Sequence, residues 1–119
     1  MKKTVVLGAS ENPSRYSFLA TTKLVAHGYP VVAIGNKEGQ IGNTNITKEH
    51  PAMDDVDTVT LYLNPTNQKP YYDYILSLKP KRVIFNPGTE NEELEDMITA
   101  QGGKAMEACT LVLLSTGQY

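Results

Sequence analysis

The residues best suited to bind a ligand follow the first apolar run of the sequence, Val5 to Leu7. This run leads into the small residues Gly8-Ala9-Ser10 and then into the polar turn Asn12-Pro13-Ser14-Arg15. A buried strand, a turn of small residues and the start of a helix commonly hold a phosphate, because backbone N–H groups and the helix dipole both favour the anion. The segment therefore predicts a nucleotide or cofactor site.

Two cations narrow the choice of cofactor. Arg15 lies near the start of the first predicted helix, where its guanidinium would add positive charge to the phosphate site. Lys37 follows the second predicted strand, where the ribose phosphate of a bound cofactor would fall. A diphosphate together with a ribose phosphate indicates coenzyme A, with NADP as the alternative. Each residue taken alone is also compatible with ordinary surface charge.

Other nucleotide sites fit the sequence less well. The pattern G-x-G-x-x-G would need glycine where Ser10 and Pro13 stand, and the second strand ends in Gly35-Asn36-Lys37 without the acid that binds ribose hydroxyls. Glu38, one step beyond, would replace that acid poorly. A P-loop is excluded, since Gly8 to Pro13 has one glycine and no following lysine. A flavodoxin-like flavin site stays open in terms of fold, although the first turn lacks a run of hydroxyl side chains.

No residue is predicted to be catalytic, and none is predicted to bind a metal. His27 falls at the end of a helix, where a cation favours the dipole, and His50 lies in a loop. Cys109 has no neighbouring histidine in the sequence and is expected to be a buried thiol. The acidic run Glu90 to Asp96 suits the start of a helix, and no Cys/His spacing typical of metal sites is present. We expect a binding protein; the alternative is an NADP-linked oxidoreductase or another nucleotide-dependent enzyme on the same fold.

Alternating strand and helix patterns position these residues. Strands are expected at residues 4–9, 31–34, 57–63, 81–85 and 104–107. Helices are expected at 14–26, from a cap at Thr66 or Asn67 to 78, and at 90–100, with a long loop at 35–51 and no clear pattern at 111–119. The alternation predicts a Rossmann-like three-layer α/β/α fold with a mostly parallel five-stranded sheet in the order 3-2-1-4-5. In such folds the ligand lies beyond the carboxyl ends of the strands.

Apolar spacing predicts which helix faces are buried. In the first helix the apolar positions recur at Phe18, Leu19, Thr22, Val25 and Ala26. In the last predicted helix the positions expected to face the core are Leu94, Met97 and Ile98.

Length and composition agree with one soluble domain spanning residues 1–119. The chain has 119 residues and a formal net charge of −2, so it has no basic field that would attract nucleic acid. No segment approaches the roughly 18 consecutive apolar residues of a membrane-spanning helix. With no export signal and a lone cysteine, a cytoplasmic location is expected. A protein partner or a homo-oligomer stays open.

The opening pattern G-A-S-x-N-P-S-R-x-S resembles that of the small bacterial CoA-binding proteins. The likeness continues through H-G-Y-x-V, N-K followed by Ile41-Gly42, Val56-Asp57, Asn86-Pro87-Gly88 and Glu107-Ala108-Cys109, and so covers essentially the whole chain. These proteins are similar to the CoA-binding domain of the succinyl-CoA synthetase alpha subunit. That synthetase uses a phosphorylated histidine and a second, ATP-grasp subunit, and neither histidine of this chain is placed as a substitute.

The resemblance implies which turn contacts which part of CoA or acyl-CoA. It assigns the diphosphate to Gly8, Ala9 and Ser10, with the turn and helix start formed by Asn12, Pro13, Ser14 and Arg15. It assigns the adenosine ribose and its phosphate to Gly35, Asn36 and Lys37. It places Leu63 and Asn64 beside the adenine or ribose, and Pro87 and Gly88 beside the pantetheine arm.

The chain departs from the family pattern at three positions. Family members often have Asn-Pro-Lys after the second strand, where this chain has Gly35-Asn36-Lys37. Phe85 stands near the position of a frequent tryptophan in the fourth strand, and Ala108 replaces an arginine that commonly precedes the late cysteine. Without that arginine, Cys109 is a weaker candidate for an activated thiolate.

Overall fold

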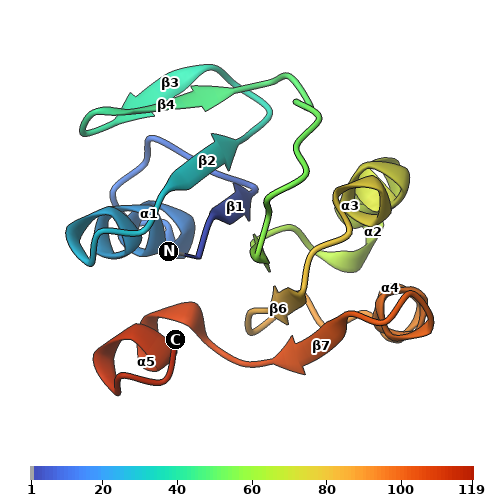
Figure 1. Cartoon of the computed structure of the whole chain (residues 1–119). Helices are drawn as coiled ribbons and strands as arrows, with labels where there is room; N and C mark the ends of the chain where they lie inside the picture. The colour runs from blue at the N-terminus through green and yellow to red at the C-terminus, as the bar shows by residue number, and fades with distance from the viewer. Residues whose placement is uncertain (1) are drawn as a thin grey trace.

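The computed structural model describes residues 2–119, which form a seven-stranded sheet between two layers of helices (Figure 1). The strands are β1 (Thr4–Leu7), β2 (Val31–Ile34), β3 (Gly39–Ile41), β4 (Thr44–Thr47), β5 (Thr58–Leu61), β6 (Arg82–Phe85) and β7 (Lys104–Glu107). The helices are α1 (Tyr16–Ala26), α2 (Pro65–Gln68), α3 (Tyr72–Leu78), α4 (Glu92–Ala100) and α5 (Thr110–Ser115), with a 3₁₀ turn at Lys69–Tyr71.

The sheet confirms the predicted α/β class and corrects its topology. Its order is β3-β4-β2-β1-β5-β6-β7, and all neighbouring strands are parallel except β3 and β4. The prediction of five strands in the order 3-2-1-4-5 was wrong. The third predicted strand is β5, which pairs with β1 on the side opposite β2. The position beyond β2 is taken by β4, so the chain must cross to the other side of β1.

The two additional strands lie in the segment predicted as a loop. They form a hairpin whose turn contains Gly42 at φ +57°, and β4 adds to the edge of β2. Only Ile41 and Ile46 of the hairpin are buried. Two apolar side chains among Gly, Asn, Gln and Thr are too few to show the period of two that identifies a strand in a sequence. Pairing with an existing strand edge supplies the stabilisation instead.

The centre of the sheet is covered on both faces. β1 and β5 are buried along their whole length, as expected of parallel strands with helices above and below. Helices α1 and α5 lie on one face, and α2, α3 and α4 lie on the other (Figure 1). Successive residues alternate between the two cores, so that Val5 and Leu7 pack towards one layer and Val6 towards the other.

The buried face of α1 differs from the predicted one. Leu19 and Val25 are 39% and 47% exposed, whereas the buried positions are Ser17, Ala20, Thr21 and Leu24. Small side chains allow a helix to lie close to the strands that it covers. In α4 the prediction was confirmed for Leu94 and Ile98, which are buried, and Met97 is half-buried against the same core.

The helix predicted at 66–78 is divided in two. Its cap is Asn64, whose Oδ1 accepts a hydrogen bond from Asn67 N at 2.9 Å, rather than Thr66 or Asn67. Pro70 lies in the 3₁₀ turn that separates α2 from α3. Because proline cannot donate the i to i−4 hydrogen bond, a continuous helix would be interrupted there.

The last ten residues contain α5 and then return to the start of β1. The Tyr119 hydroxyl shares a hydrogen bond with Thr4 Oγ1, and its ring meets Tyr29 edge-on at a centroid distance of 5.0 Å. The Arg82 guanidinium carbon lies 4.4 Å from the centroid of the same ring. These contacts attach the end of the chain to the first residues of β1 and β6 and to the segment before β2.

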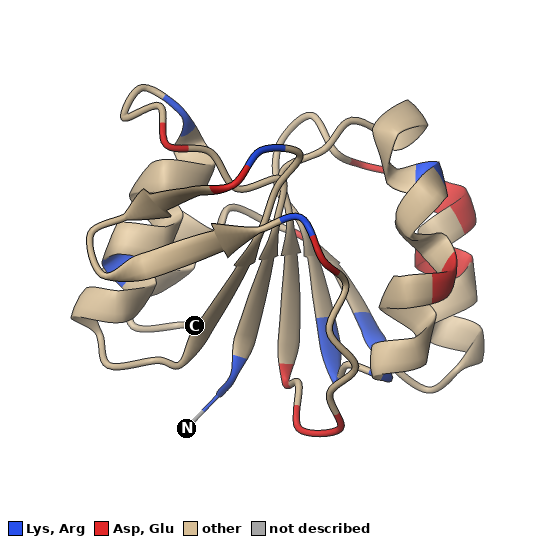
Figure 2. Ribbon diagram, turned by 90° about the horizontal axis from the view of Figure 1, so that it is seen from above, with Lys and Arg blue, Asp and Glu red and all other residues tan. Residues whose placement is uncertain are grey.

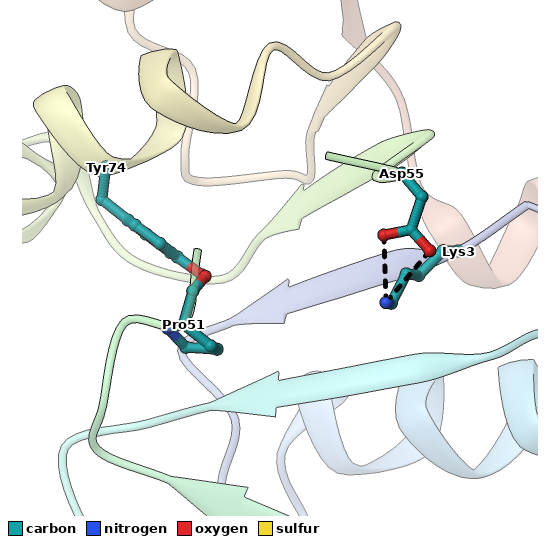
Figure 3. Close-up of polar contacts among 4 residues, drawn as sticks. All are labelled: Lys3, Pro51, Asp55 and Tyr74. Carbon is teal, nitrogen blue, oxygen red and sulfur yellow. Dashed lines mark hydrogen bonds and ion pairs between the residues drawn. The ribbon is translucent and has the colours of Figure 1, made fainter. Parts of the chain in front are cut away.

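The connection from β4 to β5 is held at two points along its course. Tyr74 of α3 donates a hydrogen bond to the Pro51 carbonyl at 2.8 Å, and Lys3 Nζ lies 3.1 Å from Asp55 Oδ1 (Figure 3). Lys3–Asp55 is the only ion pair among residues 2–119. The connection thereby returns the chain from the carboxyl edge of the sheet to the start of β5.

Charged residues lie mainly on the loops and on the helices (Figure 2). The first turn of α4 is acidic, with Glu92, Glu93 and Glu95, as the sequence predicted for a helix start. Burial, together with the neighbouring carboxylate of Glu107 on β7, raises the pKa of Glu95. No helix among residues 2–119 has the length and apolar character needed to cross a membrane.

Glu95→Gln is expected to stabilise the protein in a pH-dependent way. Folding raises the pKa of this acid, so its ionised form lowers the free energy of unfolding. The loss is greatest when the pH is above the folded-state pKa, and it disappears when the pH is below the ordinary glutamate pKa. The gain in free energy of unfolding should therefore be largest near pH 7.5 and should vanish near pH 4. Urea unfolding at both pH values measures it, with Glu92→Gln in the same turn as the control for the lost charge. A gain that does not grow with pH would contradict the repulsion with Glu107.

Candidate functional site

The turns predicted to bind a ligand lie along one edge of the sheet. The last residues of the parallel strands are in register, with Leu7 beside both Ile34 and Leu61 and with Leu61 beside Phe85. The chain continues from β1 to β2 on one side of β1 and later to β5 on the other side. Parallel α/β sheets bind ligands at the carboxyl end of such a switch point, and this edge carries all the predicted site residues.

The turn after β1 rests on the end of β2. The N–H groups of Gly8 and Ala9 both donate to the Ile34 carbonyl at 2.9 Å. A Cβ on Gly35 would lie 2.4 Å from the Ala9 carbonyl oxygen, so the close approach requires glycine at this position. Gly35, predicted to contact the ribose, is buried beneath the turn.

Gly8 itself requires a conformation that other residues rarely adopt. Its φ is +96°, and an added Cβ would lie 3.1 Å from the Tyr62 carbonyl carbon and 3.2 Å from Leu63 Cγ. Glycine therefore allows the first turn to lie against the turn after β5. Gly8 and Leu63, both predicted site residues, meet at this point.

Side chains of the first turn hold its shape and leave backbone donors free. Ser10 Oγ accepts from Asn12 N at 3.1 Å, and Asn12 Oδ1 accepts from Ser14 N and Oγ at 3.0 and 2.8 Å. Among residues 2–119, the N–H groups of Ser10 and Glu11 have no hydrogen-bond acceptor. Free, exposed amide donors after a strand are suited to an anion.

The start of α1 adds further donors beside this turn. Arg15 is the N-cap residue, and its side chain caps no backbone group. Within the described chain, the N–H groups of Tyr16 and Ser17 are also without an acceptor, whereas Phe18 N donates to the Arg15 carbonyl at 3.1 Å. The positive end of the helix dipole is therefore uncapped, and the exposed Arg15 guanidinium makes no ion pair with residues 2–119.

A polar cleft of about 230 Å³ joins the first turn to the turn after β2. The predicted residues that line it are Ala9, Ser10, Asn12, Asn36 and Lys37. Glu11 and Glu38 also line it and were not predicted, although each lies directly between or beside predicted residues. Lys37 is exposed and makes no ion pair within residues 2–119. The arrangement places amide donors and a lysine on opposite walls of one cleft.

Gln68 joins the turns after β5 and β6 and was missed by the sequence reasoning. Its side chain is fully buried, and Nε2 donates to the carbonyls of Leu63 and Thr89 at 2.8 and 2.7 Å. Its Oε1 accepts from Asn91 Nδ2 at 2.8 Å. A polar residue in a short helix carries no sequence signal for this role. Asn64, exposed beside it, caps α2.

The turn after β6 is anchored by a second buried amide. Asn86 Nδ2 donates to Thr60 Oγ1 and to the Leu61 carbonyl at 2.7 and 2.8 Å, and its Oδ1 accepts from Thr110 N at 2.9 Å. The predicted residues Pro87 and Gly88 follow it and are exposed, with Gly88 at φ +93°. They lie outside the polar cleft and face solvent at the same edge of the sheet.

The remaining chemical groups lie away from the cleft lining. Cys109, expected to be buried, is half-buried at the start of α5. Beside it, burial raises the pKa of Tyr62 to about 12, so this phenol stays neutral. His27 Nδ1 lies 2.7 Å from the Lys23 carbonyl at the end of α1, and His50 packs on the rings of Tyr71 and Tyr74. No cluster of three or more His, Cys, Asp or Glu suited to a metal occurs in residues 2–119.

A family profile described as CoA binding domain matches residues 2–115, almost the whole chain. The chain belongs to the CoA-binding domain family. The predicted membership is thereby confirmed. No curated protein matches the chain.

Solved structures share the fold over nearly its full length. A crystal structure of an uncharacterized protein is 52% identical, with a TM-score of 0.97, and the match covers 100% of this chain and 98% of that one. A hypothetical protein from Pyrococcus horikoshii OT3 is 22% identical, with a TM-score of 0.87 and coverage of 97% and 82%. A Thermus thermophilus protein is 20% identical, with a TM-score of 0.86 and coverage of 99% and 90%. The last two likenesses concern the fold alone.

Gly35→Ala is expected to destabilise this CoA-binding domain by about 1–3 kcal/mol, because the methyl group would collide with the Ala9 carbonyl and displace the first turn. Urea unfolding measures the change. Gly42→Asn is the control, since Gly42 has open space around its Cβ position and a φ that asparagine tolerates. A Gly35→Ala protein within about 0.5 kcal/mol of the unsubstituted protein would show that the turn does not depend on this contact.

Proposed function

We propose that the protein binds CoA or acyl-CoA at the carboxyl edge of its sheet and has no catalytic activity of its own. Membership of the CoA-binding domain family supports the ligand class. The observation that carries the proposal is a set of N–H groups without acceptors among residues 2–119, at Ser10 and Glu11 in the cleft lining and at Tyr16 and Ser17 at the start of α1. Lys37, which makes no ion pair within the same residues, lines the same cleft. A ligand with a diphosphate and a separate ribose phosphate offers one anion to these N–H groups and another to Lys37.

The diphosphate is proposed to bind at the first turn. Gly8, Ala9 and Ser10 form its floor, and the uncapped start of α1 supplies amide donors and the dipole. The Arg15 guanidinium follows directly and makes no ion pair among residues 2–119. Charge-assisted hydrogen bonds from such groups are stronger than neutral ones, which favours a charged ligand over a neutral nucleoside.

The other parts of the ligand are proposed to follow the same edge. Asn36 and Lys37 would bind the ribose and its phosphate, and the half-buried Leu63 with Asn64 would border the adenine or ribose. Pro87 and Gly88 would lie along the pantetheine arm, on a turn held to Leu63 through Gln68. The arm would then leave the domain towards solvent, where a partner protein could act on an acyl group, as in a succinyl-CoA synthetase-like arrangement.

Calorimetric titration with CoA, dephospho-CoA and NADPH tests the proposal. CoA is expected to bind, and to bind about tenfold more tightly than dephospho-CoA, because one charge-assisted contact to the 3′-phosphate is worth roughly 1.4 kcal/mol or more. Absence of CoA binding at millimolar concentration would overturn the proposal. Tighter binding of NADPH than of CoA would favour the NADP-linked alternative.

Substitution of the two cations locates the phosphates. Lys37→Ala should weaken CoA about tenfold and leave dephospho-CoA unchanged, because only CoA carries the ribose phosphate. Arg15→Ala should weaken both ligands equally. Lys81→Ala, which removes an exposed lysine before β6 at the opposite end of the sheet, is the control for net charge. Equal weakening of both ligands by Lys37→Ala would disprove the assignment of Lys37.

A further inference from the structure

A carboxylate joins the first turn to the β3–β4 hairpin. Glu11 Oε2 accepts a hydrogen bond from the backbone N–H of Gln40 at 2.9 Å, across 29 positions of sequence. Glu11 also lines the polar cleft, together with Ser10 and Lys37. A negative charge at a proposed phosphate site is unfavourable for the ligand, so its presence there needs a separate physical reason.

The Glu11 side chain packs directly on the backbone of Gly39. A Cβ on Gly39 would lie 2.3 Å from Glu11 Cδ and 2.6 Å from Oε1, so any side chain at this position would displace the carboxylate. Gly39 does not have a positive φ, so its backbone conformation does not itself require glycine. The hydrogen bond to Gln40 and this packing on Gly39 are together called the Glu11–Gly39 contact.

The Glu11–Gly39 contact is one of two attachments that bracket the lysine. At one end, Gly35 lies under the Ala9 carbonyl; at the other, Gly39 lies against Glu11. Only Asn36, Lys37 and Glu38 lie between the two attachments, and all three are exposed and line the cleft. The position of the Lys37 backbone relative to the amide donors is therefore set from both ends.

We propose that Glu11 is a positioning residue that sets the distance between the diphosphate donors and Lys37, and so determines selectivity for a ribose 3′-phosphate. The inference rests on the proposed CoA function. Glu11 would have two opposite effects on binding. Its charge weakens any anionic ligand, whereas its contact with the hairpin strengthens only ligands that carry the extra phosphate. Comparing the ratio of affinities for CoA and dephospho-CoA between Glu11→Gln and Glu11→Ala isolates the second effect, because both variants lack the charge.

Three single variants separate charge from position. Glu11→Gln removes the charge but keeps an oxygen acceptor for Gln40 N, so both ligands should bind equally well or more tightly and the ratio should be kept or should rise. Glu11→Ala removes the contact, and the ratio should fall about fivefold or more, close to unity. Gly39→Ala displaces the carboxylate and should lower the ratio as Glu11→Ala does. Calorimetric titration with CoA and dephospho-CoA measures all ratios, and thermal unfolding verifies that each variant is folded.

The double variant Glu11→Ala with Gly39→Ala gives the decisive comparison. If the two residues act through one contact, its ratio should be no lower than that of either single variant. The inference would be overturned if the double variant lost the sum of the two single losses in the ratio, or if Glu11→Ala left the ratio unchanged. It would also be overturned if Glu11→Gln lowered the ratio as much as Glu11→Ala does, or if the unsubstituted protein showed no preference for CoA. Failure of that protein to bind CoA would instead overturn the proposed function.

Discussion

The close approach of the first turn to the end of β2 is the constraint on which the candidate site depends. Gly8 and Ala9 both donate to the Ile34 carbonyl, and Gly35 passes under the Ala9 carbonyl where no Cβ would fit. Because these N–H groups are used inside the fold, the following donors, at Ser10 and Glu11, are the ones presented to the cleft. The same approach brings the residues after Gly35 beside Ser10, Glu11 and Asn12 in the lining of one cleft. One backbone contact thus creates both walls of the cleft.

Two buried amides hold the other half of the carboxyl edge. Asn86 joins β5, β6 and the start of α5, and Gln68 joins the turns after β5 and β6 through two carbonyls. Buried polar groups with satisfied hydrogen bonds specify one arrangement of the elements around them, whereas apolar packing tolerates small shifts. The turns after β5 and β6 are therefore held to each other and to the start of α5 by these hydrogen bonds.

The parts of the fold that the sequence predicts well are those in which local pattern and burial agree. The strand at 31–34 and the strand at 104–107 occur where predicted, and the class of the sheet is correct. The hairpin Gly39–Thr47 could not be recognised, because only two of its side chains are buried and its stability comes from pairing with β2. The strand order was wrong for the same reason, since the hairpin fills the place assigned to the next strand. The buried face of α1 was missed because close packing selects small residues, which carry little hydrophobic signal.

The order of residues was enough to predict the CoA-binding family, which the family match confirms, and the turns proposed to bind the ligand. Family membership could be predicted from four features of the sequence. These are the small residues after β1, the absence of the second and third glycines of the G-x-G-x-x-G pattern, and the positions of Arg15 and Lys37. The packing roles of individual residues became visible only in the folded structure. It assigned Gly35 to backbone packing, brought Glu11 against Gly39 and buried Gln68 between two turns. Each of these roles includes a contact with a segment more than 20 positions away, which for Gln68 is the Thr89 carbonyl. Residue type alone carries no information about which distant backbone a side chain will meet.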